Sequence, residues 1–269
     1  MANGGEPTAS LLGVRGVGSF PRSRPRRLRE TAAWRRLVAD VRVSPADLVL
    51  PLFYREGAGE PIEVTSMPGV VQHTRDSLRT AAAEAVAVGL GGLMLFAIPR
   101  DRDDIGSGAT DPRGALAQAI ESVRTEVGED TVVMADLCLD EFTAHGHCGV
   151  LDAGGRVDND ATLDRYRQMA IALADAGAQA VGTSGMMDGQ VGAVRDALEG
   201  HGRPDVAILA YAGKAASALY GPFREAVDST LTGERLTYQQ DPAASRDAVR
   251  DAALDIAEGA DIVMVKPAS

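Results

Sequence analysis

Apolar residues recur in short runs along this chain, and each run is followed by a longer stretch with helical spacing. The apolar runs predict six strands, at residues 47–53, 91–96, 131–136, 178–183, 206–211 and 261–266. The longer stretches predict six helices, at residues 31–41, 76–88, 114–127, 162–176, 192–198 and 243–258. We expect Thr74 or Ser77 to cap the second helix and Gly259 to end the last one. Short apolar strands that alternate with helices predict a parallel sheet with both faces covered, an α/β fold.

A dinucleotide-binding sheet and a (β/α) barrel both fit this alternation. The sequence that follows the first predicted strand distinguishes them. A dinucleotide-binding sheet would carry G-x-G-x-x-G after its first strand, and no such motif follows residue 53. The pattern therefore favours a (β/α)8 barrel of the TIM type. Such a barrel needs two more strands than the six predicted, and about 250 residues, of which the N-terminal region takes a share. We expect a barrel domain at residues 37–269 that is C-terminally incomplete.

Residues 1–36 differ from the rest in composition. The first 13 are rich in Gly, Ala and Ser, which predicts a flexible tail, and residues 15–36 carry eight Arg against the single acid Glu30. An organelle transit peptide is disfavoured because Pro21 and Pro25 would break its helix. A nucleic-acid arm is disfavoured because the remaining chain is strongly acidic and would repel the ligand. The pattern favours a basic arm that docks on its own body or on a neighbouring subunit.

Composition and charge exclude several classes of protein. With 45% hydrophobic and 24% charged residues the chain has an ordinary globular composition. Its longest apolar runs are far shorter than the ~20 residues of a membrane span. A pI near 4.9 argues against nucleic acid as a partner. Two Cys and no apolar signal segment predict a cytoplasmic protein.

The cationic residues are unevenly divided, since 25 are Arg and only two, Lys214 and Lys266, are Lys. Lys can lose its proton when buried and become an amine nucleophile, whereas Arg stays charged. Lys266 ends the last predicted strand and Lys214 follows the one before it. Adjacent strands lie about 4.8 Å apart, so the two amines would share a pocket and each would lower the other's pKa. The alternative is that both are ordinary surface charges.

A second group of reactive residues lies in the cysteine loop, residues 135–149, directly after the third predicted strand. It contains both cysteines of the chain, Cys138 and Cys148, with Asp140 between them. This set could hold Zn²⁺ with an open position. The alternative is two free thiols, although the spacing is not that of a standard zinc finger.

Longer motifs make the chain resemble a known family. They are "RPRRLR", "SMPGV", "DLCLDEFTAHGHCGVLD", "VDND", "SGMMDGQVGAVRDAL", "YAGKAASALYGPFREA", "GERLTYQQDP" and "EGADIVMVKPA". In this order, from about residue 20 to the last residue, they are similar to the 5-aminolevulinate dehydratase (porphobilinogen synthase) family. The resemblance implies a (β/α)8 barrel that condenses two 5-aminolevulinate molecules to porphobilinogen with loss of two waters. It also implies a homo-oligomer, commonly an octamer.

The resemblance assigns roles to residues of the pocket. Lys266 in "MVKPA" matches the lysine that forms a Schiff base with one substrate, and Lys214 matches the second lysine. Two arginines match the groups that take a substrate carboxylate, and two polar residues match groups near the substrate amine. These four are Arg224, Arg235, Asp136 and Ser184. Tyr211, Tyr220 and Phe223 are expected in the pocket wall, where simple packing explains them as well.

The resemblance also implies two metal sites. The zinc pattern of the family has three cysteines, and here Asp140 takes the middle position between Cys138 and Cys148. Asp is a harder ligand, which would weaken zinc binding and admit other divalent ions. An activating magnesium site of the family uses an acid in the helix before the last strand predicted here, where Asp251 replaces a Glu.

Two alternatives to this enzyme remain from the sequence. The family continues for two further strand–helix units, with a Ser and a Tyr that bind substrate, and these lie beyond Ser269. The chain could therefore be an incomplete record of an enzyme, or a truncated relative with an assembly or regulatory role. A Schiff-base aldolase-type barrel would explain the lysines but not the cysteine loop.

Overall fold

The computed structural model describes residues 20–244 and 246–268, which divide into two compact units between Ser44 and Pro45. The described part of the first unit contains a 3-10 turn, η1 (Pro25–Leu28), and the short helix α1 (Ala32–Leu37). The Thr31 side chain caps α1 by accepting from the backbone N–H of Trp34 at 3.1 Å. The predicted tail, residues 1–13, and Arg15 of the predicted arm lie outside the described residues.

The second unit is built on one eight-stranded sheet in the order β2-β3-β1-β4-β5-β6-β7-β8. Every neighbouring pair is parallel except β2 with β3. The strands are β1 (Val49–Arg55), β2 (Ile62–Glu63), β3 (Val71–His73), β4 (Gly92–Ile98), β5 (Val132–Leu137), β6 (Ala180–Thr183), β7 (Ala207–Lys214) and β8 (Ile262–Lys266). Among the described residues no ladder joins β8 to β2, so hydrogen bonds do not close the sheet.

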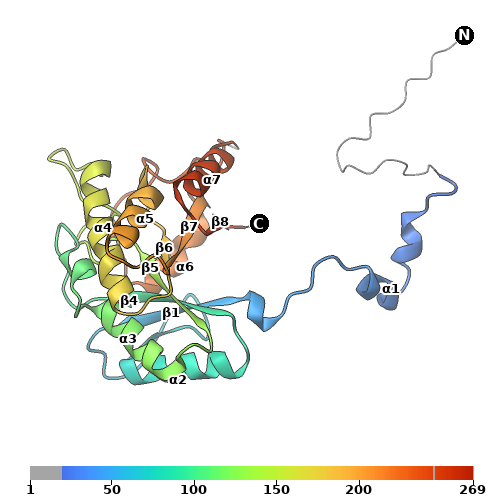
Figure 1. Ribbon diagram of the computed structural model, residues 1–269, viewed down its shortest axis with the longest axis horizontal. Coiled ribbons are helices and arrows are strands. Elements are labelled where there is room, and N and C mark those ends of the chain that lie inside the picture. The colour runs from blue at the N-terminus through green and yellow to red at the C-terminus, as the bar shows by residue number, and fades with distance from the viewer. Residues whose placement is uncertain (1–19, 245, 269) are drawn as a thin grey trace, which may run out of the picture. The chain divides into compact units, whose positions relative to one another are not determined.

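Helices follow the parallel strands and pack along the outer side of the curved sheet (Figure 1). They are α2 (Arg75–Ala87), α3 (Ala115–Val127), α4 (Asn159–Asp175), α5 (Gln190–Gly200) and α7 (Asp247–Glu258). The short helix α6 (Gly221–Ala226) and the 3-10 turns η2 (Pro45–Asp47), η3 (Ser107–Thr110) and η4 (Ala218–Tyr220) lie in connections. No helix in the described ranges has both the length and the apolar character needed to cross a bilayer.

The fully buried strand β4 explains how this sheet makes a barrel-type core. Its residues alternate between two apolar clusters because side chains along a strand point to opposite faces. Leu93 and Leu95 join the cluster between sheet and helices, whereas Met94, Phe96 and Ile98 join a second cluster on the inner face. An apolar inner face filled by side chains is the packing of a (β/α) barrel interior.

The six predicted strands are present as β1 and β4–β8, with ends shifted by a few residues. β7 continues to Lys214, three residues beyond its predicted end, because Gly213 and the residues before it still pair with β8. The very short strands β2 and β3 and the six-residue helix α6 were not predicted, since each is too short to show a period. Thr74 and Ser77 form a capping box at α2, and Gly259 ends α7 at φ 107°.

Candidate active site and metal centre

Lys214 and Lys266 end the adjacent strands β7 and β8 and lie level with each other. A one-residue bulge makes this possible. Ala210 pairs with Val263 and Gly213 with Val265. Between these two pairs β7 has two residues and β8 has one. Because side chains alternate faces along a strand, the extra residue brings both amines to the same face of the sheet.

The amine of Lys266 is enclosed by aromatic rings. Its Nζ lies 4.7 Å from the ring centre of Phe223, 5.2 Å from that of Tyr220 and 5.5 Å from that of Tyr211. These rings take the place of water around the amine. Burial, followed by the positive charge of Lys214, lowers the pKa of Lys266 from 10.5 to about 8. About a tenth of this lysine is therefore an uncharged nucleophile at pH 7, against less than about a thousandth for an ordinary lysine.

Lys214 is buried, and its amine donates a hydrogen bond to the protein backbone. Its Nζ donates to the backbone oxygen of Ser184 at 2.5 Å. The Ser184 hydroxyl donates to Asp136 Oδ2 at 3.0 Å, and the other carboxylate oxygen of Asp136 has no hydrogen-bond partner among the described residues. Burial, and then the nearby charge of Asp140, raise the pKa of Asp136 to about 7. The structure thus brings these predicted residues together beneath the two amines.

Helix α6 forms the opposite wall of the pocket. Phe223 packs edge-on against Phe96 of β4, with ring centres 5.1 Å apart, and this contact holds its ring over Lys266. Arg224 also lines the pocket and is exposed, with no side-chain hydrogen bond or ion pair to another described residue. Its guanidinium is free to take a carboxylate.

A polar contact between distant parts of the chain fixes α6 at this place. Gln72 of β3 is buried and its Nε2 donates to the backbone oxygens of Glu225 and Ala226, at 3.3 and 2.9 Å. Its Oε1 accepts from Arg55 Nε at 2.6 Å, and Arg55 also pairs with Asp228 at 2.9 Å. Carbonyls at the end of a helix need such donors. Gln72 was not singled out from the sequence, where nothing marks a glutamine in a three-residue strand.

The cysteine loop brings three potential metal ligands together. The ligand atoms of Cys138, Asp140 and Cys148 all lie within 4.8 Å of one another, and all three residues are buried. Burial, together with its hydrogen bond to Cys148, raises the pKa of Cys138. The same hydrogen bond lowers the pKa of Cys148. Two sulfurs and one carboxylate at this spacing are a donor set that fits a divalent zinc ion.

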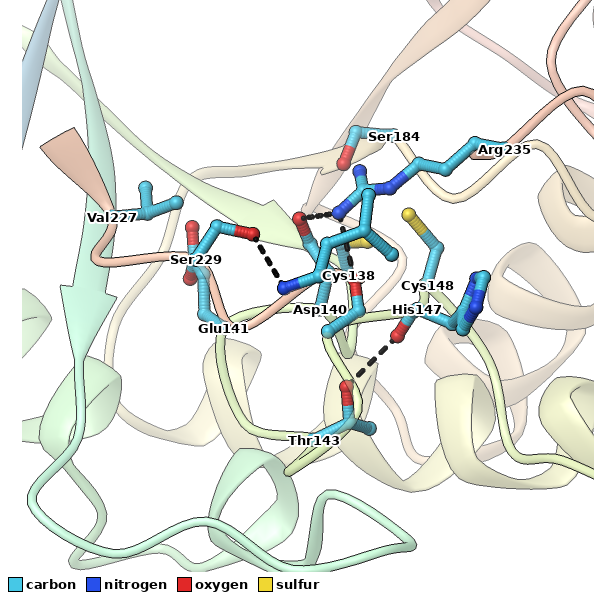
Figure 2. Close-up of polar contacts among 12 residues, drawn as sticks. Cys138, Asp140, Glu141, Thr143, His147, Cys148, Ser184, Val227, Ser229 and Arg235 are labelled. Carbon is cyan, nitrogen blue, oxygen red and sulfur yellow. Dashed lines mark hydrogen bonds and ion pairs between the residues drawn. The ribbon is translucent and has the colours of Figure 1, made fainter. Parts of the chain in front are cut away.

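Arg235 contacts this donor set directly. Its Nη2 donates to Asp140 Oδ2 and to the backbone oxygen of Gly146, each at 2.8 Å. Figure 2 shows its guanidinium pointing toward Asp140, with Cys138 and Cys148 close by. Burial opposes ionisation of Asp140, but the charges of Arg235 and Lys214, together with hydrogen bonds from Cys138 and Arg235, outweigh it and lower the pKa of that carboxyl. Arg235 lines the lysine pocket as well, so it belongs to both groups of residues.

Asp251 lies apart from both groups, on α7. Its Oδ2 accepts from Gln240 Nε2 at 2.6 Å, and Arg250 Nε lies 3.9 Å from its other oxygen. In the part of the chain that the structure describes, no set of three metal-ligating side chains includes Asp251. The magnesium site stays a prediction from the sequence.

Some residues of the site were not predicted. Ser229 and Gln239 line the lysine pocket, and Glu141 is buried next to Asp140 with one carboxylate oxygen unpartnered. Gln239 stands inside the quoted motif "GERLTYQQDP", which was the available signal. Glu141 follows Asp140 directly, and sequence alone does not tell a buried acid in a loop from an exposed one.

Relatives with known names match nearly the whole chain. The family model described as delta-aminolevulinic acid dehydratase matches residues 22–269. This chain belongs to the delta-aminolevulinic acid dehydratase family. The predicted family and the predicted α/β barrel fold are thereby confirmed, and the family consists of lyases.

Individual relatives agree with this assignment. A delta-aminolevulinic acid dehydratase of Streptomyces coelicolor is 63% identical over 253 residues, covering 93% of this chain and 77% of its own length. One from Mycobacterium tuberculosis is 62% identical over 254 residues, covering 94% of this chain and 77% of its own. The dehydratase of Toxoplasma gondii, solved with the reaction product porphobilinogen, superposes with a TM-score of 0.86 at 40% identity, over 91% of this chain and 70% of that one.

Proposed function

We propose that this chain is a porphobilinogen synthase, which condenses two molecules of 5-aminolevulinate to porphobilinogen with loss of two waters. The observation that carries the proposal is the level pairing of Lys214 and Lys266 in one enclosed pocket. A pocket with two amines suits a reaction that handles two keto substrates. Membership in the dehydratase family supports the same conclusion.

Lys266 is the residue we assign to Schiff-base formation. Its uncharged Nζ attacks the keto carbon of one substrate, and loss of water leaves an imine. The imine makes the neighbouring carbon acidic, which prepares the carbon–carbon bond to the second substrate. Aromatic rings around Nζ limit access of water to the imine.

Other pocket residues receive supporting roles. Lys214 contacts the second substrate and, by its charge, keeps part of Lys266 unprotonated. Arg224 and Arg235 take a substrate carboxylate, because a guanidinium can donate two parallel hydrogen bonds to it. Asp136 and Ser184 lie hydrogen-bonded below the amines and hold or accept protons near the substrate amine.

We propose zinc as the ion of the cysteine loop, held by Cys138, Asp140 and Cys148. The compact donor set supports this, and the carboxylate in place of a third thiolate predicts weaker binding than a three-cysteine site would give. When bound, such an ion supplies Lewis-acid polarisation of a ligand oxygen or nitrogen. An activating magnesium ion at Asp251 is a further proposal, which rests on the sequence resemblance.

Borohydride trapping tests the assignment against its alternatives. Incubation with 5-aminolevulinate and borohydride should attach one reduced substrate to Lys266, located by peptide mass spectrometry. The Lys266→Ala variant should give no adduct, and porphobilinogen formation should be lost. A folded wild-type chain without adduct would favour a non-catalytic assembly or regulatory role. An adduct without porphobilinogen, formed equally with other keto acids, would favour an aldolase-type enzyme.

We also propose that the chain forms a homo-oligomer, an octamer as the family resemblance implies, in the cytoplasm. The first unit supports assembly because it exposes apolar side chains that a neighbouring copy could cover: Trp34, Leu37, Val41 and Val43. Light scattering after gel filtration measures the subunit number. Two buried free thiols are consistent with a reducing compartment.

A further inference from the structure

The ion pair between Arg235 and Asp140 connects two sites that the proposed function treats separately. Asp140 belongs to the donor set of the cysteine loop, and both Asp140 and Arg235 also line the lysine pocket. Both side chains are buried, 8% and 6% exposed, so neither charge can turn to solvent when it loses its partner. A buried charge without a partner is costly, and each residue therefore needs a replacement partner before the pair can separate.

A divalent ion in the cysteine loop would compete with Arg235 for Asp140. The Asp140 oxygen nearest the guanidinium accepts its hydrogen bond at 2.8 Å. The ligand atoms of Cys138 and Cys148 lie within 4.8 Å of the ligand atom of Asp140, so an ion held by all three would lie close to the guanidinium. Two positive charges at such a distance in a buried site repel strongly. While Arg235 holds Asp140, we therefore expect its charge to weaken the binding of a cation in the loop.

Arg235 has a second possible partner within the lysine pocket. Its Nε is buried and has no hydrogen-bond partner among the described residues. The side chain lines the same pocket as Lys266 and Arg224, in which the substrate carboxylate would bind. A carboxylate there offers Arg235 a charged partner equal to Asp140. It can therefore take the guanidinium without leaving a buried positive charge unpaired.

The segment that carries Arg235 is built to allow such an exchange. We call residues 228–239 the covering segment because they lie over the cysteine loop. Apart from the contacts of Arg235 with Asp140 and Gly146, three hydrogen bonds join it to the loop. Thr230 Oγ1 donates to the Thr143 oxygen at 3.3 Å, the Tyr238 hydroxyl lies 3.0 Å from His147 Nδ1, and the same hydroxyl accepts from the backbone N–H of Cys148 at 3.5 Å. Most of its remaining residues are exposed. We expect a small shift of this segment to move the guanidinium.

We propose that Arg235 exchanges its partner between Asp140 and the substrate carboxylate, and thereby makes substrate and metal bind cooperatively. The substrate carboxylate withdraws Arg235 from Asp140 and frees a carboxylate oxygen for the ion. Linkage requires the reverse effect to be equal, so the ion raises the affinity for substrate by the same factor. This inference rests on the proposed function, since it takes a carboxylate substrate in the lysine pocket as given.

Cobalt titration of the full chain tests the coupling without any turnover. Co²⁺ bound to thiolates absorbs in the near ultraviolet, and 4-oxopentanoate has the keto and carboxylate groups of the substrate but no amine. We expect 4-oxopentanoate to increase Co²⁺ affinity about tenfold. Arg235→Gln should bind Co²⁺ more tightly than wild type without the keto acid and should show no further increase with it.

Arg224→Gln is the matched control, because Arg224 lines the same pocket but does not touch Asp140. It should bind the keto acid more weakly, yet bind Co²⁺ as wild type does when the keto acid is absent. Asp140→Asn gives an independent measurement that does not use a metal. It removes the competitor for Arg235 and should therefore tighten binding of 4-oxopentanoate, measured by the concentration needed for half-maximal borohydride trapping.

The outcomes separate this inference from the proposed function. If 4-oxopentanoate is trapped on Lys266 but leaves Co²⁺ affinity unchanged, the partner exchange is wrong and the enzyme assignment stands. The exchange is also wrong if Arg224→Gln and Arg235→Gln change Co²⁺ affinity equally. If no adduct with Lys266 forms at all, the proposed function itself is wrong.

Discussion

We expect the partly buried, charged amine of Lys266 to lower the free energy of unfolding of the protein. The enclosing rings and the neighbouring Lys214 lower the pKa of Lys266 from 10.5 to about 8. At 1.36 kcal/mol for each tenfold change, this difference amounts to about 3.4 kcal/mol against the charged form. Lys266 is partly exposed, so solvent screening reduces the figure. We expect Lys266→Met to raise the free energy of unfolding by about 2–3 kcal/mol at pH 7.

The pH dependence distinguishes this effect from simple repacking. The folded pKa lies below the unfolded one, so between pH 8 and 10.5 the unfolded chain binds more protons at this residue. Stability of the wild type therefore rises with pH in this window relative to the variant. The advantage of Lys266→Met should be fully present below pH 8. It should fall to about 1 kcal/mol at pH 9.5 and vanish above the unfolded pKa.

Urea unfolding followed by far-ultraviolet circular dichroism measures this difference. Circular dichroism is chosen over fluorescence because the single Trp of the chain, Trp34, belongs to the first unit and not to the barrel. Lys266→Arg is the control, since it keeps a cation at every pH and should gain no stability. A variant Lys266→Met that is no more stable than wild type at pH 7, or whose advantage is the same at pH 9.5, would refute the reasoning.

Four further predictions follow from the site. Borohydride trapping on Lys266 should speed up about fivefold from pH 7 to pH 8 as the amine loses its proton, and a rate independent of pH would contradict a pKa of about 8. Gln72→Met removes two hydrogen bonds that hold α6 and should raise KM several-fold, about 1 kcal/mol, with a smaller change in kcat; an unchanged KM would mean that α6 holds its place without them. Cys148→Ser should weaken zinc binding at least about a hundredfold in a chelator competition, and equal affinity would remove it from the ligand set. Gly146 and Gly155 both have a positive φ, 72° and 76°, but only at Gly146 would an added methyl group clash with the covering segment. Gly146→Ala should therefore lower the melting temperature more than Gly155→Ala. An equal decrease in melting temperature for the two variants would mean that the covering segment moves to accommodate the methyl group.

The sequence predicted the parts of the fold that repeat. The central strands β4–β7 have apolar runs because both of their faces are covered, and the outer helices have the matching period. β8 has an apolar run as well, although Ile262, Val263 and Val265 are exposed. β2 and β3 have two and three residues, too few for any period, and their pairing depends on β1 lying beside them. α6 begins with Gly221 and Pro222, which is typical of a loop. Its place depends on contacts with Gln72, which is 153 residues away in the chain from Glu225.

The site, like the fold, has parts that could be predicted from the sequence and parts that could not. Lys214 and Lys266 could be paired from the sequence because parallel strands end at one rim and the chain has only two lysines. Cys138, Asp140 and Cys148 could be grouped because a single loop carries them. The pairing of Arg235 with Asp140 could not be predicted, since these residues are 95 positions apart and both lie outside regular strands and helices. Only the packing of the covering segment on the cysteine loop brings them into contact.

The bulge in β7 has a consequence for how a pocket with two amines can originate. In a regular ladder Lys266 would lie level with Gly213, and Lys214 would point to the opposite face of the sheet, toward the outer helices. One inserted residue in β7 reverses this and changes no side chain. A barrel with one reactive amine and a barrel with two are therefore separated by a single insertion or deletion. Strand length, as much as the choice of catalytic residue, is a variable on which selection in such barrels can act.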